Sequence, residues 1–90
     1  MFYVYYLQSL KNASHNYVGY SANLKKRIST HNSGLSKATK PYHPWQLIFY
    51  EAYLDKKDAK RREGYLKTTK GRKALKLMLR DSLKQRGKQV

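Results

Sequence analysis

The chain has 90 residues and no cysteine, and its 20 Lys and Arg against 5 Asp and Glu give a formal net charge of +15. A chain of this length forms one domain that buries roughly 60–65% of the surface of its unfolded form. The lack of cysteine excludes disulfides, thiolate zinc sites and cysteine nucleophiles. No apolar run approaches the roughly 18–20 residues that span a bilayer. We therefore expect no membrane partner and a cytoplasmic, nucleoid-associated location.

The positive charge indicates a polyanionic partner, and nucleic acid is the common one. Fourteen of the 20 basic residues lie between Lys56 and Lys88. A merely solvated surface is the alternative explanation. Self-repulsion among so many like charges costs folding stability, which favours the nucleic-acid interpretation.

The first half of the chain predicts a hairpin followed by a helix. Residues Phe2–Leu7 are aromatic and β-branched, and because both faces of this segment are apolar it should be a central strand. A polar loop over residues 9–15 leads to a second, antiparallel strand over residues 17–20. Ser21 or Asn23 then caps a helix with an amphipathic stripe. That stripe consists of Leu24, Ile28 and His31, and the helix ends at Asn32, Ser33 and Gly34.

The second half predicts one more strand and two more helices. A loop over residues 35–44 precedes a third strand, Trp45–Tyr53. Asp55, with Asp58 three residues later, comes close to a capping box for the second helix. Thr68 or Thr69 starts the last helix. The second helix carries Ala59, Glu63 and Leu66, and the apolar face of the last consists of Leu75, Met78, Leu79 and Leu83.

This order predicts an α+β fold, in which helices flank a three-stranded antiparallel sheet in the order β-β-α-β-α-α. We expect residues 1–84 to form the single domain and residues 85–90 to be a basic C-terminal tail.

Few carboxylates are available for metal chemistry. A two-metal phosphodiesterase needs several converging acids, and four of the five acids suit helix starts, the third strand or the last helix. Glu63 is the exception, because it lies mid-helix among bases. Its simplest role is an ion pair, and its candidate partners are Lys60, Arg62 and Lys67. The alternative is a one-metal site, since Mg²⁺ takes only one or two carboxylates and completes its shell with water and phosphate oxygens.

Arg27 and His31 lie four residues apart and therefore share one face of the predicted helix. A guanidinium holds a phosphate through two hydrogen bonds at once, and an imidazole binds a phosphate or transfers a proton. A basic, solvated helix face is the simpler interpretation.

The tyrosines offer a second route to proton transfer. Tyr5 and Tyr17 lie on two strands of one hairpin, and Gly19 allows a close approach beside them. Neighbouring cations favour the ionised form of a phenol, which takes a proton from water. Aromatic packing explains most of the nine tyrosines equally well.

Together these residues resemble the GIY-YIG nuclease superfamily, which includes the N-terminal domain of the UvrC repair nuclease and intron homing endonucleases. The first motif appears as YVY at residues 3–5 and the second as YVG at residues 17–19. Arg27, His31 and Glu63 fall at the positions of the family Arg, of a Tyr or His, and of the metal-binding Glu. The resemblance covers roughly residues 2–79 and is strongest to small stand-alone, UvrC-like members.

Two positions depart from the family pattern. Tyr3 replaces the first Gly of the first motif. Tyr20 stands where the repair nucleases carry Lys, which removes one cation that favours base activation.

The resemblance implies a metal-dependent endonuclease that hydrolyses phosphodiester bonds, with DNA favoured over RNA and one strand cut per active site. Tyr17 would be the general base or orient the water, and Tyr5 would hydrogen-bond to Tyr17 or to the scissile phosphate. Arg27 would hold the phosphate, His31 would assist, and Glu63 would bind one Mg²⁺ or Mn²⁺ ion. We expect a monomer or weak dimer.

Other bases would hold the nucleic-acid backbone without reading sequence. The candidates are Lys37, Lys40, Lys56, Lys57, Lys60, Arg61, Lys70, Arg72 and Lys73. The alternative functions are a catalytically weak or inactive nucleic-acid-binding module on the same scaffold, and a basic assembly protein that docks on a ribosome or an acidic partner.

Overall fold

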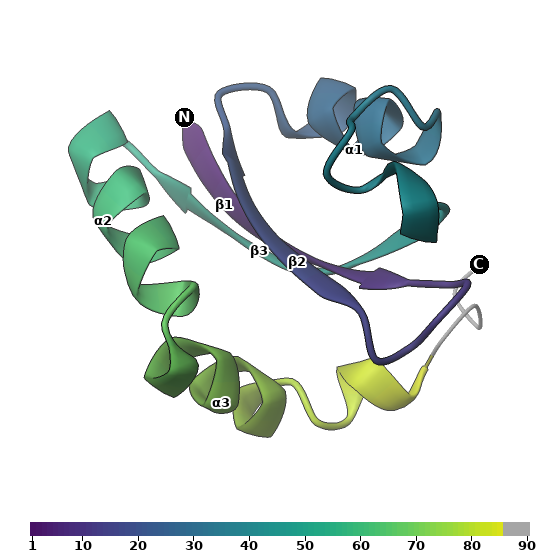
Figure 1. Ribbon diagram of the computed structural model, residues 1–90. Helices are drawn as coiled ribbons and strands as arrows, with labels where there is room; N and C mark the ends of the chain where they lie inside the picture. The colour runs from purple at the N-terminus through teal and green to yellow at the C-terminus, as the bar shows by residue number, and fades with distance from the viewer. Residues whose placement is uncertain (86–90) are drawn as a thin grey trace.

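A three-stranded antiparallel sheet forms the centre of the protein (Figure 1). The computed structural model describes residues 1–85. The strands are β1 (Phe2–Ser9), β2 (Asn16–Ser21) and β3 (Trp45–Tyr53), in the spatial order β2-β1-β3. The central position predicted for the first strand is therefore confirmed, and β2 and β3 are the edge strands.

Helices cover both faces of this sheet (Figure 1). Helix α1 (Leu24–Asn32) lies on one face, and α2 (Lys56–Leu66) and α3 (Thr69–Met78) lie on the other. Two 3₁₀ turns, η1 (Lys40–Tyr42) and η2 (Ser82–Lys84), complete the chain. The predicted α+β class and the order β-β-α-β-α-α are thus confirmed. Of the predicted tail, residues 86–90 lie outside the described residues.

The alternating side chains of β1 supply two separate clusters of the core, because successive residues of a strand point to opposite faces. Tyr5 and Leu7 pack with Trp45 on the α1 face. Val4 and Tyr6 pack on the other face, with core residues from β2, α2 and α3. Those further core residues are Val18, Ala59, Leu66, Leu75 and Leu79.

Each helix begins at a side-chain cap. Asn23 accepts a hydrogen bond from the Lys26 amide, and Thr68 accepts one from the Gly71 amide. Asp55 caps α2 through the Lys57 amide. The predicted capping box is not completed, because Asp58 pairs with Arg61 instead of reaching back to the cap.

The predicted apolar face of the last helix needs one correction. Leu75 and Leu79 are buried and Leu83 packs against the same core, but Met78 is 50% exposed. Helix α3 ends at Met78, and Leu79 has left helical geometry (φ −108°, ψ 19°). The buried face of α3 therefore does not include Met78, its last residue, and Leu83 packs from the η2 turn instead of from the helix.

One partly buried ion pair connects α2 to the edge strand β3. Arg62 on α2 donates from Nε and Nη2 to the two carboxylate oxygens of Glu51 on β3, at 2.9 and 3.1 Å. Tyr53 also donates to Glu51, at 2.6 Å. A forked pair of this kind defines orientation as well as distance. It turns the Arg62 side of α2 toward β3 and leaves Glu63 on another side of the helix.

No helix among the described residues has both the length and the apolar character needed to cross a membrane.

The junction between α2 and α3 gives a stability test. A Cβ atom at Gly71 would lie 2.1 Å from the Tyr65 carbonyl oxygen, whereas one at Gly64 would meet nothing within 4 Å. We expect Gly71→Ala to lower the free energy of unfolding by about 1–3 kcal/mol, because the two backbones have to move apart. The matched change Gly64→Ala should raise it by roughly 0.5–1 kcal/mol, the helix preference of Ala over Gly. Urea unfolding monitored by circular dichroism measures both. Equal effects in the two variants would contradict this view of the junction.

Candidate active site

Tyr5 occupies a position that only glycine leaves open on the neighbouring strand. Tyr5 on β1 faces Gly19 on β2 in the antiparallel register. A Cβ atom at Gly19 would lie 2.3 Å from both Cζ and the hydroxyl oxygen of Tyr5. The Tyr5 ring therefore crosses the backbone of Gly19, so the close approach that a glycine allows is taken here by an aromatic ring instead of by a phosphate or another backbone.

The Tyr5 hydroxyl begins a buried hydrogen-bonded chain that ties the sheet to α1. It lies 2.7 Å from Nε2 of His31, and Nδ1 of His31 lies 2.7 Å from the Thr39 hydroxyl. The backbone oxygen of Thr39 accepts a hydrogen bond from the Trp45 indole at 3.0 Å. Tyr5, His31 and Thr39 are each only 1% exposed. His31 is thus a buried member of the site with both ring nitrogens engaged.

Burial sets the protonation of this chain. Burial, and then the negative charge of an ionised Tyr17, raise the pKa of Tyr5 well above its ordinary value of 10.0. Burial, and then the positive charge of Arg27, lower the pKa of His31 below its ordinary value of 6.5. At neutral pH Tyr5 is therefore a neutral phenol and His31 a neutral imidazole, so both act as hydrogen-bonding groups without charge.

Tyr17 lies beside this chain but keeps part of its surface open to solvent. Its ring centroid is 5.1 Å from that of His31 and 6.3 Å from that of Tyr5. On its other side, the ammonium of Lys67 from α2 lies 5.9 Å from the ring centroid. Of the two motif tyrosines, Tyr17 is the one that water reaches.

Arg27 is exposed on α1 and borders a hollow of about 460 Å³. The hollow is also lined by Ser21, Ala22, Asn23, Lys26 and Thr30. The charge of Arg27 acts on both buried groups, because it lowers the pKa of Tyr5 and of His31. The guanidinium is therefore close enough to influence the Tyr5–His31 pair electrostatically while remaining accessible to a ligand.

Glu63 reaches the same region from α2, where two lysines hold its carboxylate. Lys60 Nζ lies 3.0 Å from Oε1, and Lys67 Nζ lies 3.1 Å from Oε2. Partial burial opposes ionisation of the carboxyl group, but the hydrogen bonds and charges of the two lysines outweigh it and lower the pKa of Glu63 below 4.5. Of the three predicted ion-pair partners, Lys60 and Lys67 are confirmed and Arg62 is wrong, because Arg62 pairs with Glu51.

Lys67 links the acid to the tyrosines, because the same ammonium contacts Glu63 and lies over the ring of Tyr17. The negative charge of Glu63 also raises the pKa of Tyr5. The structure thus connects Tyr5, Tyr17, His31 and Glu63 through contacts beside edge strand β2, and the charge of Arg27 acts on Tyr5 and His31, although these residues come from three layers of the fold.

A metal at this position would have to bind with few protein ligands. Among residues 1–85 no three His, Asp or Glu side chains cluster to hold an ion. A single ionised carboxylate still fits Mg²⁺ or Mn²⁺, because such ions complete their shells with water and phosphate oxygens. Glu63 is the acid in this region that fits.

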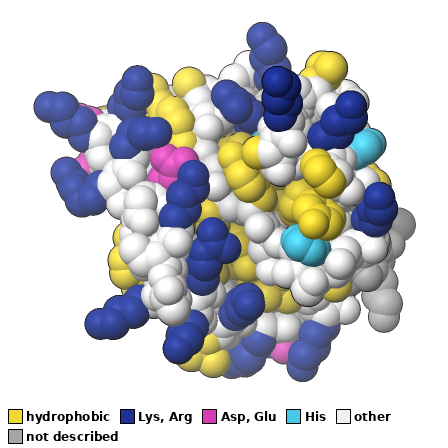
Figure 2. Space-filling view, in the orientation of Figure 1, with side chains coloured by type: hydrophobic (Ala, Val, Ile, Leu, Met, Phe, Trp, Pro, Cys, Tyr) yellow, Lys and Arg dark blue, Asp and Glu magenta, His cyan; other side chains and the backbone are white. Residues whose placement is uncertain are grey.

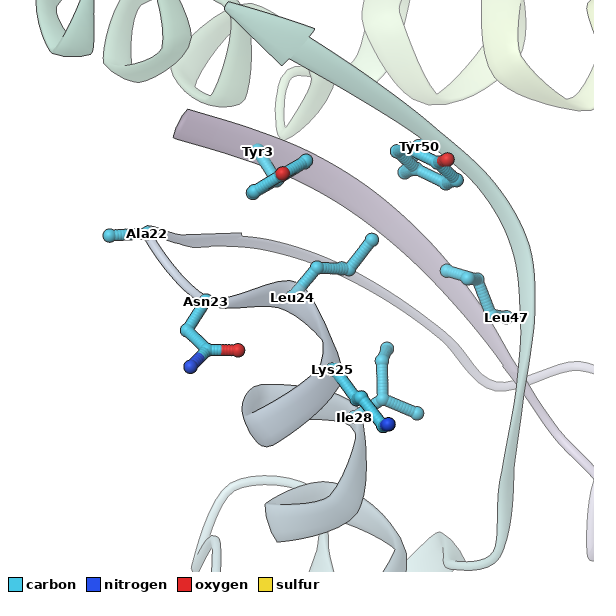
Figure 3. Close-up of a pocket in the computed structure, with 8 residues that line it drawn as sticks. All are labelled: Tyr3, Ala22, Asn23, Leu24, Lys25, Ile28, Leu47 and Tyr50. Carbon is cyan, nitrogen blue, oxygen red and sulfur yellow. The ribbon is translucent and has the colours of Figure 1, made fainter. Parts of the chain in front are cut away.

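A second groove, of about 540 Å³, opens between α1 and the sheet (Figure 3). Tyr3 and Tyr50 stand on the sheet side, and Leu24, Lys25 and Ile28 stand on the α1 side (Figure 3). The groove shares Ala22 and Asn23 with the hollow beside Arg27. The two hollows therefore lie next to each other, on either side of Ala22 and Asn23.

All nine predicted backbone-binding bases have exposed side chains, and Lys and Arg side chains surround the face seen in Figure 2. Three of them already have partners. Lys60 pairs with Glu63, Arg61 pairs with Asp58, and Arg72 donates to the Lys67 carbonyl oxygen. Arg61 also faces the β3 side of α2, where it lines a hollow with Tyr53 and Tyr65. It therefore lies on a different side of the helix from Glu63.

Two contributors to the site were not predicted. Thr39 lies in a segment that the sequence presents as an irregular loop, and no local pattern marks it as buried. The bridge from Glu63 through Lys67 to Tyr17 depends on how α2 lies against β2, which no spacing within α2 reveals. Thr39, for its part, is the residue at the start of the η1 turn, and its hydroxyl lies within hydrogen-bond distance of Nδ1 of His31.

A family model described as the GIY-YIG catalytic domain matches residues 1–76 of this chain. The chain therefore belongs to the GIY-YIG superfamily. Members of this superfamily are nucleases, and their substrates are nucleic acids. Within it, the chain is similar to small proteins named UPF0213.

The similarity to UPF0213 proteins extends over most of the chain, in sequence and in structure. A UPF0213 protein of Staphylococcus haemolyticus is 38% identical over 84% of this chain and 92% of its own length. One of Clostridium perfringens is 35% identical over 94% of this chain and 90% of its own. The solution structure of UPF0213 protein BH0048 from Bacillus halodurans superimposes with a TM-score of 0.54 at 30% identity, covering 87% of this chain and 85% of that one.

The buried imidazole predicts a pH dependence of stability. Because the pKa of His31 is lowered in the folded protein, the unfolded chain binds the proton more readily. We expect the contribution of His31 to be fully present above pH 6.5 and to be lost as the pH falls from 6.5 through the folded pKa. The free energy of unfolding, measured with urea between pH 5 and pH 8, should fall less toward low pH in His31→Gln than in wild type. His43→Gln is the control and should keep the wild-type profile, since His31 is intact. A wild-type slope in His31→Gln would contradict the assignment.

Proposed function

We propose that this protein is a Mg²⁺- or Mn²⁺-dependent endonuclease that cuts one strand of DNA per active site. The observation that carries the proposal is the set of contacts that connects Tyr5, Tyr17 and Glu63, with the charge of Arg27 acting on Tyr5 and His31, in a chain of the GIY-YIG family.

The two phenols have different roles in this proposal. Tyr5 stays protonated because its pKa is raised, so it donates or accepts a hydrogen bond but does not remove a proton. Tyr17 is the solvent-accessible phenol, with Lys67 over its ring. Tyr17 therefore orients the attacking water or takes its proton, and Tyr5, fixed by His31, orients Tyr17 or the phosphate.

Arg27 holds the scissile phosphate. Its exposed guanidinium presents a planar fork that matches two phosphate oxygens, and its place beside the tyrosines puts positive charge where negative charge develops. His31 acts through Tyr5, because its two ring nitrogens are bonded to Tyr5 and Thr39.

Glu63 is the residue that would hold the divalent ion. Its carboxylate is ionised at neutral pH. The ammonium group of Lys67, which pairs with this carboxylate, also lies over the ring of Tyr17. When bound, the ion supplies positive charge that stabilises the leaving 3′ oxygen. One such ion needs only one protein carboxylate, which matches the supply of acids in this region.

The exposed bases on α2, α3 and the η1 segment hold the sugar–phosphate backbone. Such contacts give affinity without sequence specificity. A single site in each chain suits a monomer or a weak dimer, and a nucleoid-associated, cytoplasmic location follows from a DNA substrate.

An inactive nucleic-acid-binding module is the second candidate. Two observations favour it: Tyr20 stands where repair nucleases carry Lys, and both oxygens of Glu63 are already held by ammonium groups. Tight, salt-sensitive binding without cleavage of any DNA or RNA structure would support this alternative and contradict the endonuclease proposal.

Cleavage of supercoiled, branched and single-stranded DNA in Mg²⁺ or Mn²⁺ tests the proposal. Glu63→Gln and Arg27→Ala should each lower the cleavage rate by at least about 100-fold, the effect expected for loss of a transition-state contact. Arg27→Lys should recover only part of the activity, because it keeps the charge but loses the fork.

Asp58→Asn is the matched control for Glu63, since Asp58 lies on α2 but pairs with Arg61. It should cut at the wild-type rate. Wild-type cleavage by Glu63→Gln or Arg27→Ala, in correctly folded protein, would show that the active residues have been assigned wrongly.

The ionic-strength dependence of binding measures the backbone contacts. Contact with about six phosphates should give a slope of log K against log salt near −5, at about −0.9 per phosphate. Lys57→Ala or Lys73→Ala should weaken binding of all sequences alike and reduce the slope by about one unit. Fluorescence anisotropy at several salt concentrations measures this. A slope that both variants leave unchanged would remove these two residues from the interface.

A further inference from the structure

Both oxygens of the Glu63 carboxylate are occupied in the free protein. Lys60 holds Oε1 at 3.0 Å and Lys67 holds Oε2 at 3.1 Å, while the Glu63 side chain is only 13% exposed. A divalent ion that binds this carboxylate therefore has to displace at least one ammonium group. The lysine side chains are 52% and 44% exposed, so both have room to move away from the carboxylate.

The exchange keeps the carboxylate paired with positive charge. One Mg²⁺ or Mn²⁺ ion carries the same charge as the two ammonium groups that it replaces at the oxygens of Glu63. The released ammonium groups stay attached beside the site, because Lys60 lies 4.7 Å from the ring centroid of Tyr20 and Lys67 lies 5.9 Å from that of Tyr17. Each then lacks its anionic partner and is free to pair with a phosphate.

We propose that Lys60 and Lys67 close the Glu63 site in the free protein and are released to the nucleic-acid backbone when a divalent ion binds. Metal and nucleic acid then bind cooperatively. The ion frees two cations for phosphate, and phosphates that capture those cations vacate the carboxylate for the ion. Such coupling is reciprocal, so each ligand raises the affinity for the other by the same factor. This inference rests on the proposed function, because it takes Glu63 to be the metal ligand.

Mn²⁺ affinity of the free protein gives the first test, measured by electron paramagnetic resonance or calorimetry. We expect the double variant Lys60→Met/Lys67→Met to bind Mn²⁺ on the order of tenfold more tightly than wild type, within the usual range of coupling factors. Methionine keeps the apolar stem that covers the tyrosine rings and removes only the charge.

The matched control is Lys57→Met/Lys73→Met. It removes the same charge from α2 and α3, but neither lysine has an ion pair with Glu63 in the described part of the chain. Screening limits the effect of such exposed charges at a distance, so this control should change Mn²⁺ affinity much less. Equal tightening in the two double variants would overturn the proposal, because the effect would then be one of net charge. Unchanged affinity in Lys60→Met/Lys67→Met would also overturn it.

Binding of a short labelled DNA duplex gives the second test, made in an Arg27→Ala background so that the duplex stays intact. Mn²⁺ should raise DNA affinity in the parent, and this increase should be smaller with Lys60→Met/Lys67→Met, where only the direct contact of the ion with phosphate remains. The Lys57→Met/Lys73→Met control should bind more weakly with and without Mn²⁺ and keep the full increase. An increase of parental size after the loss of Lys60 and Lys67 would contradict the proposed release.

Glu63→Gln separates failure of this proposal from failure of the proposed function. If Glu63→Gln abolishes both Mn²⁺ binding and cleavage but the lysine variants behave as the control does, the endonuclease proposal stands and the lysine exchange is wrong. If Glu63→Gln binds Mn²⁺ and cuts DNA like wild type, Glu63 is not the metal ligand, so the lysine exchange fails together with the assignment of Glu63, although the protein is still an endonuclease. If neither wild type nor any variant cuts DNA, the endonuclease proposal itself fails.

Discussion

The contact between the ring of Tyr5 and the bare backbone of Gly19 is the constraint on which the site depends. Any side chain at Gly19 would occupy the place of the Tyr5 hydroxyl. Because the ring crosses β2 at this point, its hydroxyl meets His31 on α1, and the sheet and helix are joined by a buried polar contact. Buried hydrogen bonds of this kind are costly to leave unmade, so Thr39 completes the chain on the far side of the imidazole.

The acid arrives from the opposite layer of the protein. Helix α2 covers the other face of the sheet, and the fork between Arg62 and Glu51 decides which side of the helix faces β3. Because Arg62 faces β3, Glu63, the next residue along the helix, faces another direction. Lys67 pairs with Glu63 and lies over the ring of Tyr17. A surface ion pair is usually worth little energy, but a forked one has a defined geometry, and here geometry is what the site requires.

The sequence predicted the strands, the helices and their order, because hydrophobic periodicity and end caps are local patterns. The two apolar faces of Phe2–Leu7 were enough to place that strand at the centre of the sheet. Spacing marked Tyr5, Tyr17, Arg27, His31 and Glu63 only as candidates with simpler explanations, and the resemblance to the GIY-YIG superfamily joined them into one predicted site.

What the sequence did not predict depends on contacts between distant segments. Thr39 lies in a segment without periodicity, so its burial follows only from the η1 turn and the Trp45 indole above it. The sequence made Arg62 as good a candidate as Lys60 or Lys67 for an ion pair with Glu63. Only the position of β3 shows that Arg62 pairs with Glu51 instead. Met78 fits the repeat of its helix, but the helix ends there.

The positive charge also affects how copies of the protein interact through the two edge strands, β2 and β3. Within residues 1–85, strands β2 and β3 each have one side without a partner strand, and such edges are templates for pairing with another chain. A net charge of +15 opposes this pairing through mutual repulsion. A polyanion that neutralises the charge also removes the repulsion, so crowding of several copies on one long nucleic acid would bring unpaired edges together. The charge that attracts such a ligand therefore also acts against self-association of the free protein.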